Sequence, residues 1–234
     1  LYYKKKLRKI IIIDDYSNKK FNADILINYN LDASKKNYQR SKIKKFLIGT
    51  SYCLIRSDFT RKNRKPVKKN ILITFGAGRF LKQIKNLLVE TLNFCKNHNK
   101  KIIFNIVVNA KELVNFKNFF KDFNYKINYI TNQTNLSTQM SKCDFAITAA
   151  GVTVYELASL GVPFISFQLA KNQYLTSKKI NKLGIGCAFP NAYDLNLKYY
   201  KKIFFKFLND IQFKGKISKK AQSIVNKNGA KNVL

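Results

Sequence analysis

Short apolar runs alternate with longer amphipathic stretches along the last two thirds of the chain. Residues 71–75, 102–108 and 125–130 have the length and apolar content of buried parallel strands. Residues 80–95 and 111–120, which lie between them, are long enough for helices. This alternation predicts an α/β fold built on a parallel sheet.

The same alternation continues toward the end of the chain, where glycine and proline mark the boundaries of the elements. Gly161 is placed to end a helix, and Pro163 to open the strand after it. The remaining predicted elements are strands at 143–148 and 164–167, a helix that follows Gly151 and stops at Gly161, and helices at 137–142, 174–183, 195–208 and 217–226.

Three short apolar runs near the start, at residues 9–15, 24–28 and 46–49, predict strands of a preceding α/β domain. A charged, proline-containing stretch without periodicity follows at 61–69 and predicts a linker. We therefore expect a domain boundary near Pro66, with residues 1–66 and 67–234 on its two sides. Leu1 is not a natural start, so we expect residues 1–66 to be the C-terminal part of an incomplete domain.

The charge is extreme but dispersed, with 45 Lys plus Arg against 12 Asp plus Glu and a formal net charge of +33. Lysines occur in nearly every predicted element and form no nucleic-acid-binding signature, so we expect no specific nucleic-acid partner. The charge predicts a surface that attracts anionic substrates or an acidic membrane face without specificity. No apolar run approaches the roughly 18 residues that span a bilayer, so we expect a cytoplasmic protein.

The four cysteines are far apart and, with the single histidine, form no zinc-binding pattern. We therefore expect reduced structural thiols and neither a metal nor another cofactor.

Residues 149–163 carry the clearest chemical signal. Small residues at Ala150 and Gly151 separate a predicted strand from a predicted helix, whose first amides and positive dipole end suit a phosphate. Glu156, in the first helical turn, is placed to accept hydrogen bonds from a ribose diol. Thr153 and Glu156 also fit a capping box, in which the glutamate only folds back onto its own helix. The local sequence leaves both interpretations open.

A second glycine turn, Gly76-x-Gly78, follows the predicted strand 71–75 and is another candidate anion-binding loop. The third glycine of the dinucleotide fingerprint and its later acidic residue are missing, which argues against NAD binding. The alternative is that these glycines only allow tight packing of a strand against a helix.

Several segments together resemble the UDP-sugar hydrolases of pseudaminic acid biosynthesis and related proteins of surface-polysaccharide pathways. The Asp14-Asp15-Tyr16 and Tyr52-x-Leu54-Ile55-Arg56-x-x-Phe59 motifs point to the hydrolase branch, whereas 149–163 belongs to a broader group. That group has the two-domain GT-B architecture, which it shares with the lipid II-forming N-acetylglucosaminyltransferases. The other matching segments are 23–28, 48–51, 74–78, 169–173 and 228–230.

The resemblance implies that a UDP-sugar lies in the cleft between two domains. By it, Glu156 would hold the ribose, the Ala150–Gly151 turn and Thr153 the pyrophosphate, and the main chain near Leu136 the uracil. Asn172 and Gln173 would face the sugar or phosphate, with Asn172 as the candidate catalytic residue of this chain, and the Gly76 and Gly78 loop would complete the site.

The general base of the family is a histidine in an N-terminal Gly-His segment, which this chain does not contain. We expect that base in the missing part of the N-terminal domain, because His98 stands among Asn and Lys at the end of a predicted helix. The chain also has Gly76-Ala77-Gly78-Arg79 where relatives carry Gly-Gly and a polar residue, so the sugar contacts of this loop differ.

Three functions remain open at this point. The first is a UDP-sugar hydrolase of nonulosonate or surface-glycan biosynthesis, acting on a UDP-2,4-diacetamido-2,4,6-trideoxy-hexose. The second is a GT-B glycosyltransferase that uses a UDP-sugar donor. The third is a basic binding module for nucleic acid or anionic lipid.

Overall fold

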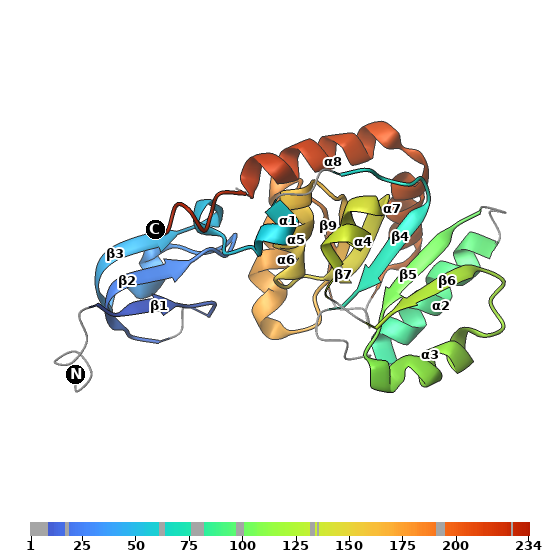
Figure 1. The fold of residues 1–234 in the computed structure, drawn as a ribbon, viewed down its shortest axis with the longest axis horizontal. Helices are drawn as coiled ribbons and strands as arrows, with labels where there is room; N and C mark the ends of the chain where they lie inside the picture. Colours follow the sequence, from blue (N-terminus) through green and yellow to red (C-terminus); the bar gives the residue numbers. More distant parts are fainter. Residues whose placement is uncertain are drawn as a thin grey trace.

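The computed structural model contains two parallel sheets that lie toward opposite ends of an elongated molecule (Figure 1). A three-stranded sheet is formed near the N-terminus and a six-stranded sheet by the later part of the chain. The structure describes residues 9–16, 19–60, 64–75, 82–96, 101–131, 134, 136–190, 195–225 and 227–234.

The six-stranded sheet has the order β6-β5-β4-β7-β8-β9, and all its neighbouring strands are parallel. The predicted strands are confirmed, and each is observed within about two residues of its expected position. A sixth strand, β9, was not predicted. The strands are β4 (Asn70–Thr74), β5 (Ile103–Val107), β6 (Lys126–Ile130), β7 (Phe145–Ala149), β8 (Phe164–Phe167) and β9 (Cys187–Phe189).

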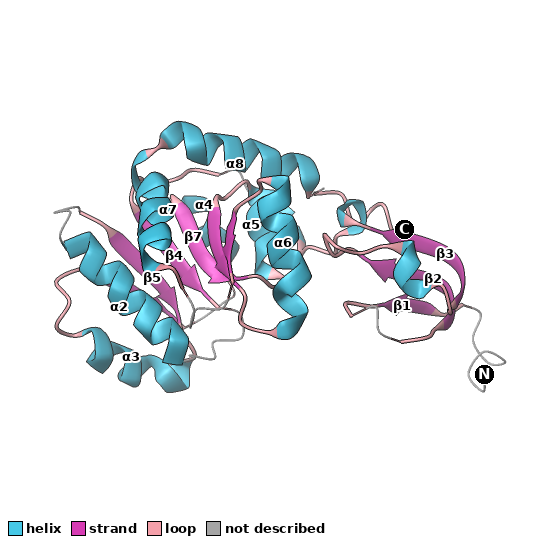
Figure 2. Cartoon of the chain, turned by 180° about the vertical axis from the view of Figure 1, so that it is seen from behind, coloured by secondary structure: helices cyan, strands magenta, loops and turns pink. Residues whose placement is uncertain are grey.

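Helices cover both faces of this sheet (Figure 2). Ile71 and Ile73 of β4 pack on one face against α2, α3 and α7, whereas Leu72 packs on the other against α4, α5 and α6. Because successive side chains of a strand point to opposite faces, three successive apolar residues contribute to the hydrophobic cores on both faces of the sheet. The helices are α2 (Lys82–Lys96), α3 (Leu113–Phe120), α4 (Leu136–Lys142), α5 (Thr153–Leu160), α6 (Tyr174–Leu183), α7 (Leu197–Asn209) and α8 (Ile211–Ile224).

The predicted start of the last helix at residue 217 is wrong, because α8 begins six residues earlier, at Ile211. Asp210 caps it by accepting a hydrogen bond from the Phe213 amide at 2.8 Å. Gly215 lies inside the helix, where sequence propensity alone would favour a break. Tertiary packing of Ile217 and Ala221 against the two cores therefore outweighs the glycine.

The three-stranded sheet has the order β1-β2-β3 and is also parallel, with β1 at Ile11–Ile13, β2 at Asn22–Asn28 and β3 at Lys42–Ile48. Its small core contains Ile25 and Ile27 of β2 with Leu47 of β3. The short helix α1 (Ser57–Thr60) follows and packs on α5. The predicted boundary near Pro66 remains a prediction.

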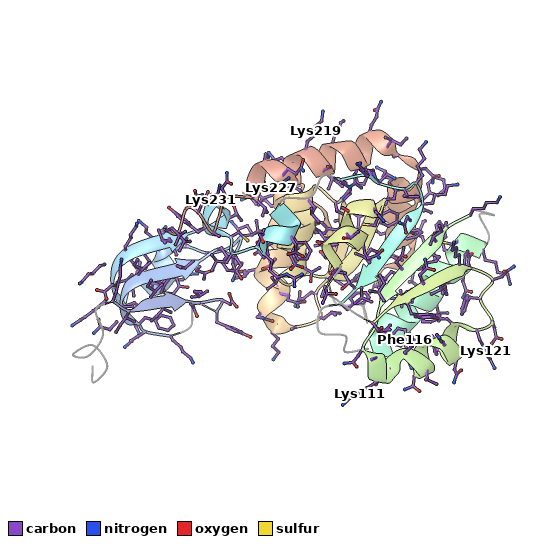
Figure 3. The ribbon with its side chains drawn as sticks, viewed as in Figure 1. Lys111, Phe116, Lys121, Lys219, Lys227 and Lys231 are labelled. Carbon is purple, nitrogen blue, oxygen red and sulfur yellow. The ribbon has the colours of Figure 1, made fainter. Side chains whose placement is uncertain are left out.

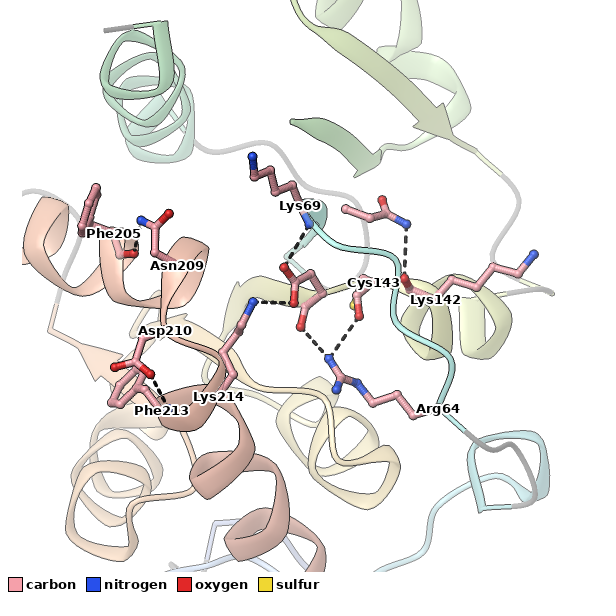
Figure 4. A network of polar contacts seen from close by, with 11 residues as sticks. Arg64, Lys69, Lys142, Cys143, Phe205, Asn209, Asp210, Phe213 and Lys214 are labelled. Atoms are coloured by element: carbon pink, nitrogen blue, oxygen red, sulfur yellow. Dashed lines mark hydrogen bonds and ion pairs between the residues drawn. The ribbon is translucent and has the colours of Figure 1, made fainter. Parts of the chain in front are cut away.

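A buried polar network fixes the segment after residue 63 to the six-stranded sheet (Figure 4). Asp144, just before β7, forms an ion pair with Lys214 of α8 at 2.5 Å, and both side chains are about nine-tenths buried. The other Asp144 oxygen accepts the Lys69 amide at 3.0 Å. The Arg64 guanidinium donates to the carbonyls of Cys143 and Asp144 at 3.2 and 2.5 Å. The segment 64–69 before β4 and the residues before β7 are thus bonded to each other, and Asp144 links them to α8.

The last residues return to the three-stranded sheet, so the C-terminus lies beside β3 (Figure 1). Asn232 donates to the Ser51 carbonyl at 2.7 Å, and Thr50 donates to the Ile224 carbonyl at 2.6 Å. Val233 packs against the small core of the sheet. The chain therefore connects the two sheets twice.

The four cysteines are free, in agreement with the expected reduced thiols. In the part of the chain that the structure describes, no helix combines the length and apolar character needed to cross a membrane.

Candidate functional site

The predicted phosphate turn lies between β7 and α5. Ala150 is buried and donates its amide to the Phe167 carbonyl at 2.9 Å, which fixes the turn to β8. Gly151 follows and is half-buried, and α5 begins two residues later at Thr153. The helix ends at Gly161, as predicted, in the left-handed conformation that glycine adopts without strain.

The capping-box alternative is not supported by the geometry of this helix. Val152, rather than Thr153, occupies the N-cap position of α5, and no side chain caps it. Thr153 is already the first helical residue, so the register required for a box with Glu156 is absent. The Glu156 carboxyl group is therefore left for another role.

Glu156 lies in the seam between α5 and the segment that leads into α1. Burial raises the pKa of its carboxyl to about 7, while nearby Arg56 lowers it and Asp58 raises it. Burial, and then the Glu156 charge, raise the pKa of Cys53 to about 12. A half-buried carboxyl group that changes charge near neutral pH is typical of functional sites.

Gln173 and Asn172 belong to the single 3-10 turn Lys171–Gln173, which follows β8. Gln173 accepts the Leu169 amide at 2.8 Å, and this bond orients its side chain. Its Nε2 lies 3.5 Å from the position that a Cβ on Gly151 would occupy, so the structure brings Gln173 and the phosphate turn together. Asn172 donates to the Tyr16 hydroxyl at 3.4 Å, across the seam between the two sheets.

Leu136 is the first residue of α4, and its side chain is buried in the same cluster as Ala150 and Val154. The N-terminus of α4 therefore lies on the α5 side of the sheet. Gly76 and Gly78 fall outside the described residues, and so does His98.

Tyr155 makes contacts across the seam that the sequence did not predict. Its hydroxyl accepts the Leu31 amide at 3.0 Å and donates to Asn30 Oδ1 at 3.3 Å. Its ring meets that of Tyr29 edge to face, with centroids 5.8 Å apart. The only signal in the sequence was a tyrosine next to Glu156 in a helix start that is otherwise small and aliphatic.

The loop after β2 continues this contact to the end of β1. Asn30 donates to the Asp15 carbonyl at 2.9 Å. Tyr38 donates to Asp14 at 2.6 Å and accepts from Asn28 at 2.7 Å. The carboxyl ends of β1 and β2 are thus held against the start of α5, and the residues of the resemblance motif Asp14-Asp15-Tyr16 lie at the seam.

No family model matches the chain. A curated Helicobacter pylori protein named pseudaminic acid cytidylyltransferase and UDP-2,4-diacetamido-2,4,6-trideoxy-beta-L-altropyranose hydrolase is 29% identical over 191 residues. The match covers 78% of this chain and 34% of that protein. The chain therefore spans about a third of the length of this relative, and its similarity concerns that part alone.

Among solved structures, MurG of Acinetobacter baumannii matches with a TM-score of 0.67 and 18% identity, covering 99% of this chain and 67% of that one. The UDP-GlcNAc 2-epimerase of Neisseria meningitidis, bound to UDP-GlcNAc, matches with a TM-score of 0.54 and 17% identity. That match covers 75% of this chain and 44% of the epimerase. The parallel α/β structure of this chain, which the sequence pattern predicted, is thus of the GT-B type that the resemblance implied.

Proposed function

We propose that this chain holds the nucleotide of a UDP-sugar and forms part of an enzyme of surface-glycan biosynthesis. The observation that carries the proposal is the Glu156 carboxyl group, which is half-buried in the first turn of α5 and has no capping role. It lies one helical turn beyond the Gly151 turn. A carboxylate at this distance from a phosphate-binding turn suits a ribose diol.

The remaining contacts follow from this placement of the ribose. The Ala150–Gly151 turn and Thr153 would face the pyrophosphate, because they lie at the positive end of the α5 dipole, which favours a negative charge. Gln173, which lies against Gly151, would donate its amide to the same phosphates.

The uracil and the sugar are the two ends of the substrate, on either side of the ribose and phosphates. The main chain near Leu136 would contact the uracil. Asn172, which faces Tyr16 across the seam, would lie at the reacting sugar and is our candidate catalytic residue. Gly76 and Gly78 keep their predicted role beside the substrate.

Hydrolysis of the sugar–phosphate linkage, with release of UDP, is the reaction that we favour. It is supported by the curated relative, whose name includes a UDP-sugar hydrolase, and by the Asp14-Asp15-Tyr16 segment at the seam. Glycosyl transfer from a UDP-sugar is the second candidate, and the match to MurG over 99% of this chain favours it.

The ribose contact is tested by calorimetric titration with UDP and with 2′-deoxy-UDP. A hydrogen bond to a charged group contributes about 1.5–3 kcal/mol. The wild-type protein should therefore bind UDP roughly 10- to 100-fold more tightly than the deoxy ligand. Glu156→Gln should lose most of this preference and bind both ligands alike.

Glu112→Gln is the matched control, because it makes the same change at a glutamate beside α3, which packs on the opposite face of the sheet. It should keep the wild-type preference for UDP. If Glu156→Gln retains the full preference for UDP, the proposed ribose contact is wrong.

The reaction itself is tested with a protein that also carries the N-terminal Gly-His segment expected of the family, incubated with the UDP-activated diacetamido-trideoxy-hexose. Free sugar and UDP formed without an acceptor would support hydrolysis. Turnover that depends strictly on an added acceptor would replace hydrolysis by transfer.

A further inference from the structure

A groove of about 850 Å³ lies between α2 and the corner where α7 meets α8, away from the candidate site. Its apolar lining includes Phe94 of α2 and Phe205 of α7, with Ile211 at the start of α8. Lys201, Lys202 and Lys206 of α7 line it as well. We call these six residues the α7 groove.

Of the apolar residues of the α7 groove, Phe94 packs against the protein core, with its ring centroid 5.9 Å from that of Phe204, whereas Phe205 and Ile211 are exposed. Tyr200, Phe204 and Phe207 of α7 point inward and are buried against α2 and the sheet. Phe205 follows Phe204 but does not belong to this inward-pointing set, and its side chain is 43% exposed. Ile211 is 65% exposed. Phe205 and Ile211 thus form a small exposed apolar surface beside the lysines.

The charge of the α7 groove is positive. Lys201 reaches Glu90 at 3.2 Å, but this ion pair is partly exposed and therefore weak. Asp210, which also lines the groove, is engaged as the cap of α8. The groove thus combines apolar side chains with lysines in a chain of net charge +33, and its charge complements an anionic amphiphile.

The overall charge alone does not single out this groove. Figure 3 shows lysines projecting from well-separated parts of the molecule, among them Lys111 and Lys121 beside α3 and Lys219 on α8. Dispersed lysines attract anions to every face. The α7 groove differs because its lysines flank exposed aromatic and aliphatic side chains in a cavity.

The choice of occupant follows from the type of cation. Among the described residues that line the groove, the cations are lysines and none is an arginine. Protein–protein interfaces are enriched in arginine and depleted of lysine, because the planar guanidinium binds carboxylates in a fixed geometry. Lysine is a flexible point charge that suits the diffuse negative potential of lipid headgroups. A second copy of the chain is disfavoured, since two chains of net charge +33 repel each other.

We propose that the α7 groove docks this protein on an anionic lipid surface. Lys201, Lys202 and Lys206 lie among the headgroups, while Phe205 and Ile211 reach the boundary with the acyl chains. Helices α2 and α7 cover the opposite face of the six-stranded sheet from α5 and α6 (Figure 2). Docking through this groove therefore leaves the α5 turn accessible to a nucleotide in solution.

The test is co-sedimentation of the chain with vesicles of phosphatidylcholine alone and with vesicles that contain about 30% phosphatidylglycerol. Each lysine near an anionic surface contributes a factor of about five in affinity. Lys202→Gln with Lys206→Gln should therefore weaken binding to the anionic vesicles about 25-fold. Phe205→Ser with Ile211→Ser should weaken it at least tenfold without any change in charge.

Lys117→Gln with Lys121→Gln is the matched control, because both lysines are exposed and lie on or next to α3. This pair removes the same charge and should change vesicle affinity by no more than about twofold. The substituted lysines and Ile211 are exposed and Phe205 is 43% exposed, so the far-UV circular dichroism should stay at wild-type values and the thermal midpoint should shift by no more than a few degrees.

Three results would overturn the proposal. The first is an equal loss in the α7 and α3 lysine pairs, which would assign binding to dispersed charge. The second is wild-type binding that does not depend on phosphatidylglycerol. The third is binding to polyglutamate, but not to vesicles, that requires Phe205 and Ile211, which would assign the groove to an acidic protein.

Discussion

Glu156 makes the stability of this protein depend on pH in a direction opposite to that of most carboxylates. Its pKa rises from an ordinary 4.5 to about 7 in the folded state, chiefly because the group is buried. Between these two values the folded chain keeps a proton that the unfolded chain has lost. The contribution of Glu156 to stability is therefore fully present below about pH 4.5, and it is lost as the pH rises through 7.

The size of the effect follows from the shift in pKa. One pKa unit corresponds to about 1.4 kcal/mol. A rise in pKa from 4.5 to about 7 therefore makes the folded state about 3 kcal/mol less stable well above pH 7 than well below pH 4.5. Between pH 5 and pH 8 the folded state should lose about 2.5 kcal/mol of this. Gln is nearly isosteric and carries no charge at either pH, so Glu156→Gln should abolish this part of the pH dependence.

The assay is urea unfolding at pH 5, 6, 7 and 8 and constant ionic strength, for the wild type and Glu156→Gln. The other titrating groups are common to both proteins, so the difference between their free energies of unfolding isolates Glu156. This difference should change by about 2.5 kcal/mol between pH 5 and pH 8. Glu112→Gln should instead give a curve parallel to that of the wild type. Parallel curves for Glu156→Gln, to within about 0.5 kcal/mol, would refute the reasoning.

Three further substitutions test the packing by urea unfolding. Lys214→Met should cost about 3 kcal/mol, because it leaves the buried Asp144 carboxylate without its cation; a loss below about 1 kcal/mol would contradict this. Gly229→Ala should cost about 2 kcal/mol, because its Cβ would collide with the backbone of Cys53; unchanged stability would show that the tail does not pack there. Gly215→Ala lies in a helix with open space around it and should gain about 0.5–1 kcal/mol; a loss would mean that the added methyl group meets a neighbour.

Most of the sheet could be predicted from the sequence, because buried parallel strands appear as uninterrupted apolar runs. β7 and β8 are such runs, and the small residues and Gly161 around α5 mark the borders of that helix. β9 contains only three residues and gives no such pattern. Short strands of this kind are fixed by pairing with a neighbour, here β8, and propensity does not reveal them.

The candidate site was predictable only on one side of the seam. The turn at Ala150 and Gly151 and the position of Glu156 follow from local sequence, because a strand, a turn and a helix start occur within one short segment. The contact of Tyr155 with Asn30 and the electrostatic interaction of Glu156 with Arg56 join residues a hundred or more positions apart. No local pattern encodes such a contact, which depends on how the two sheets meet.

The return of the C-terminal residues to the three-stranded sheet also has a mechanical consequence. The sheets are joined once through the segment around α1 and again where Asn232 and Gly229 meet the Ser51–Cys53 segment. Two chain connections restrict the relative rotation of the two sheets more than a single connection would. We therefore expect any opening of the seam to break the Tyr155–Asn30 and Asn172–Tyr16 contacts together.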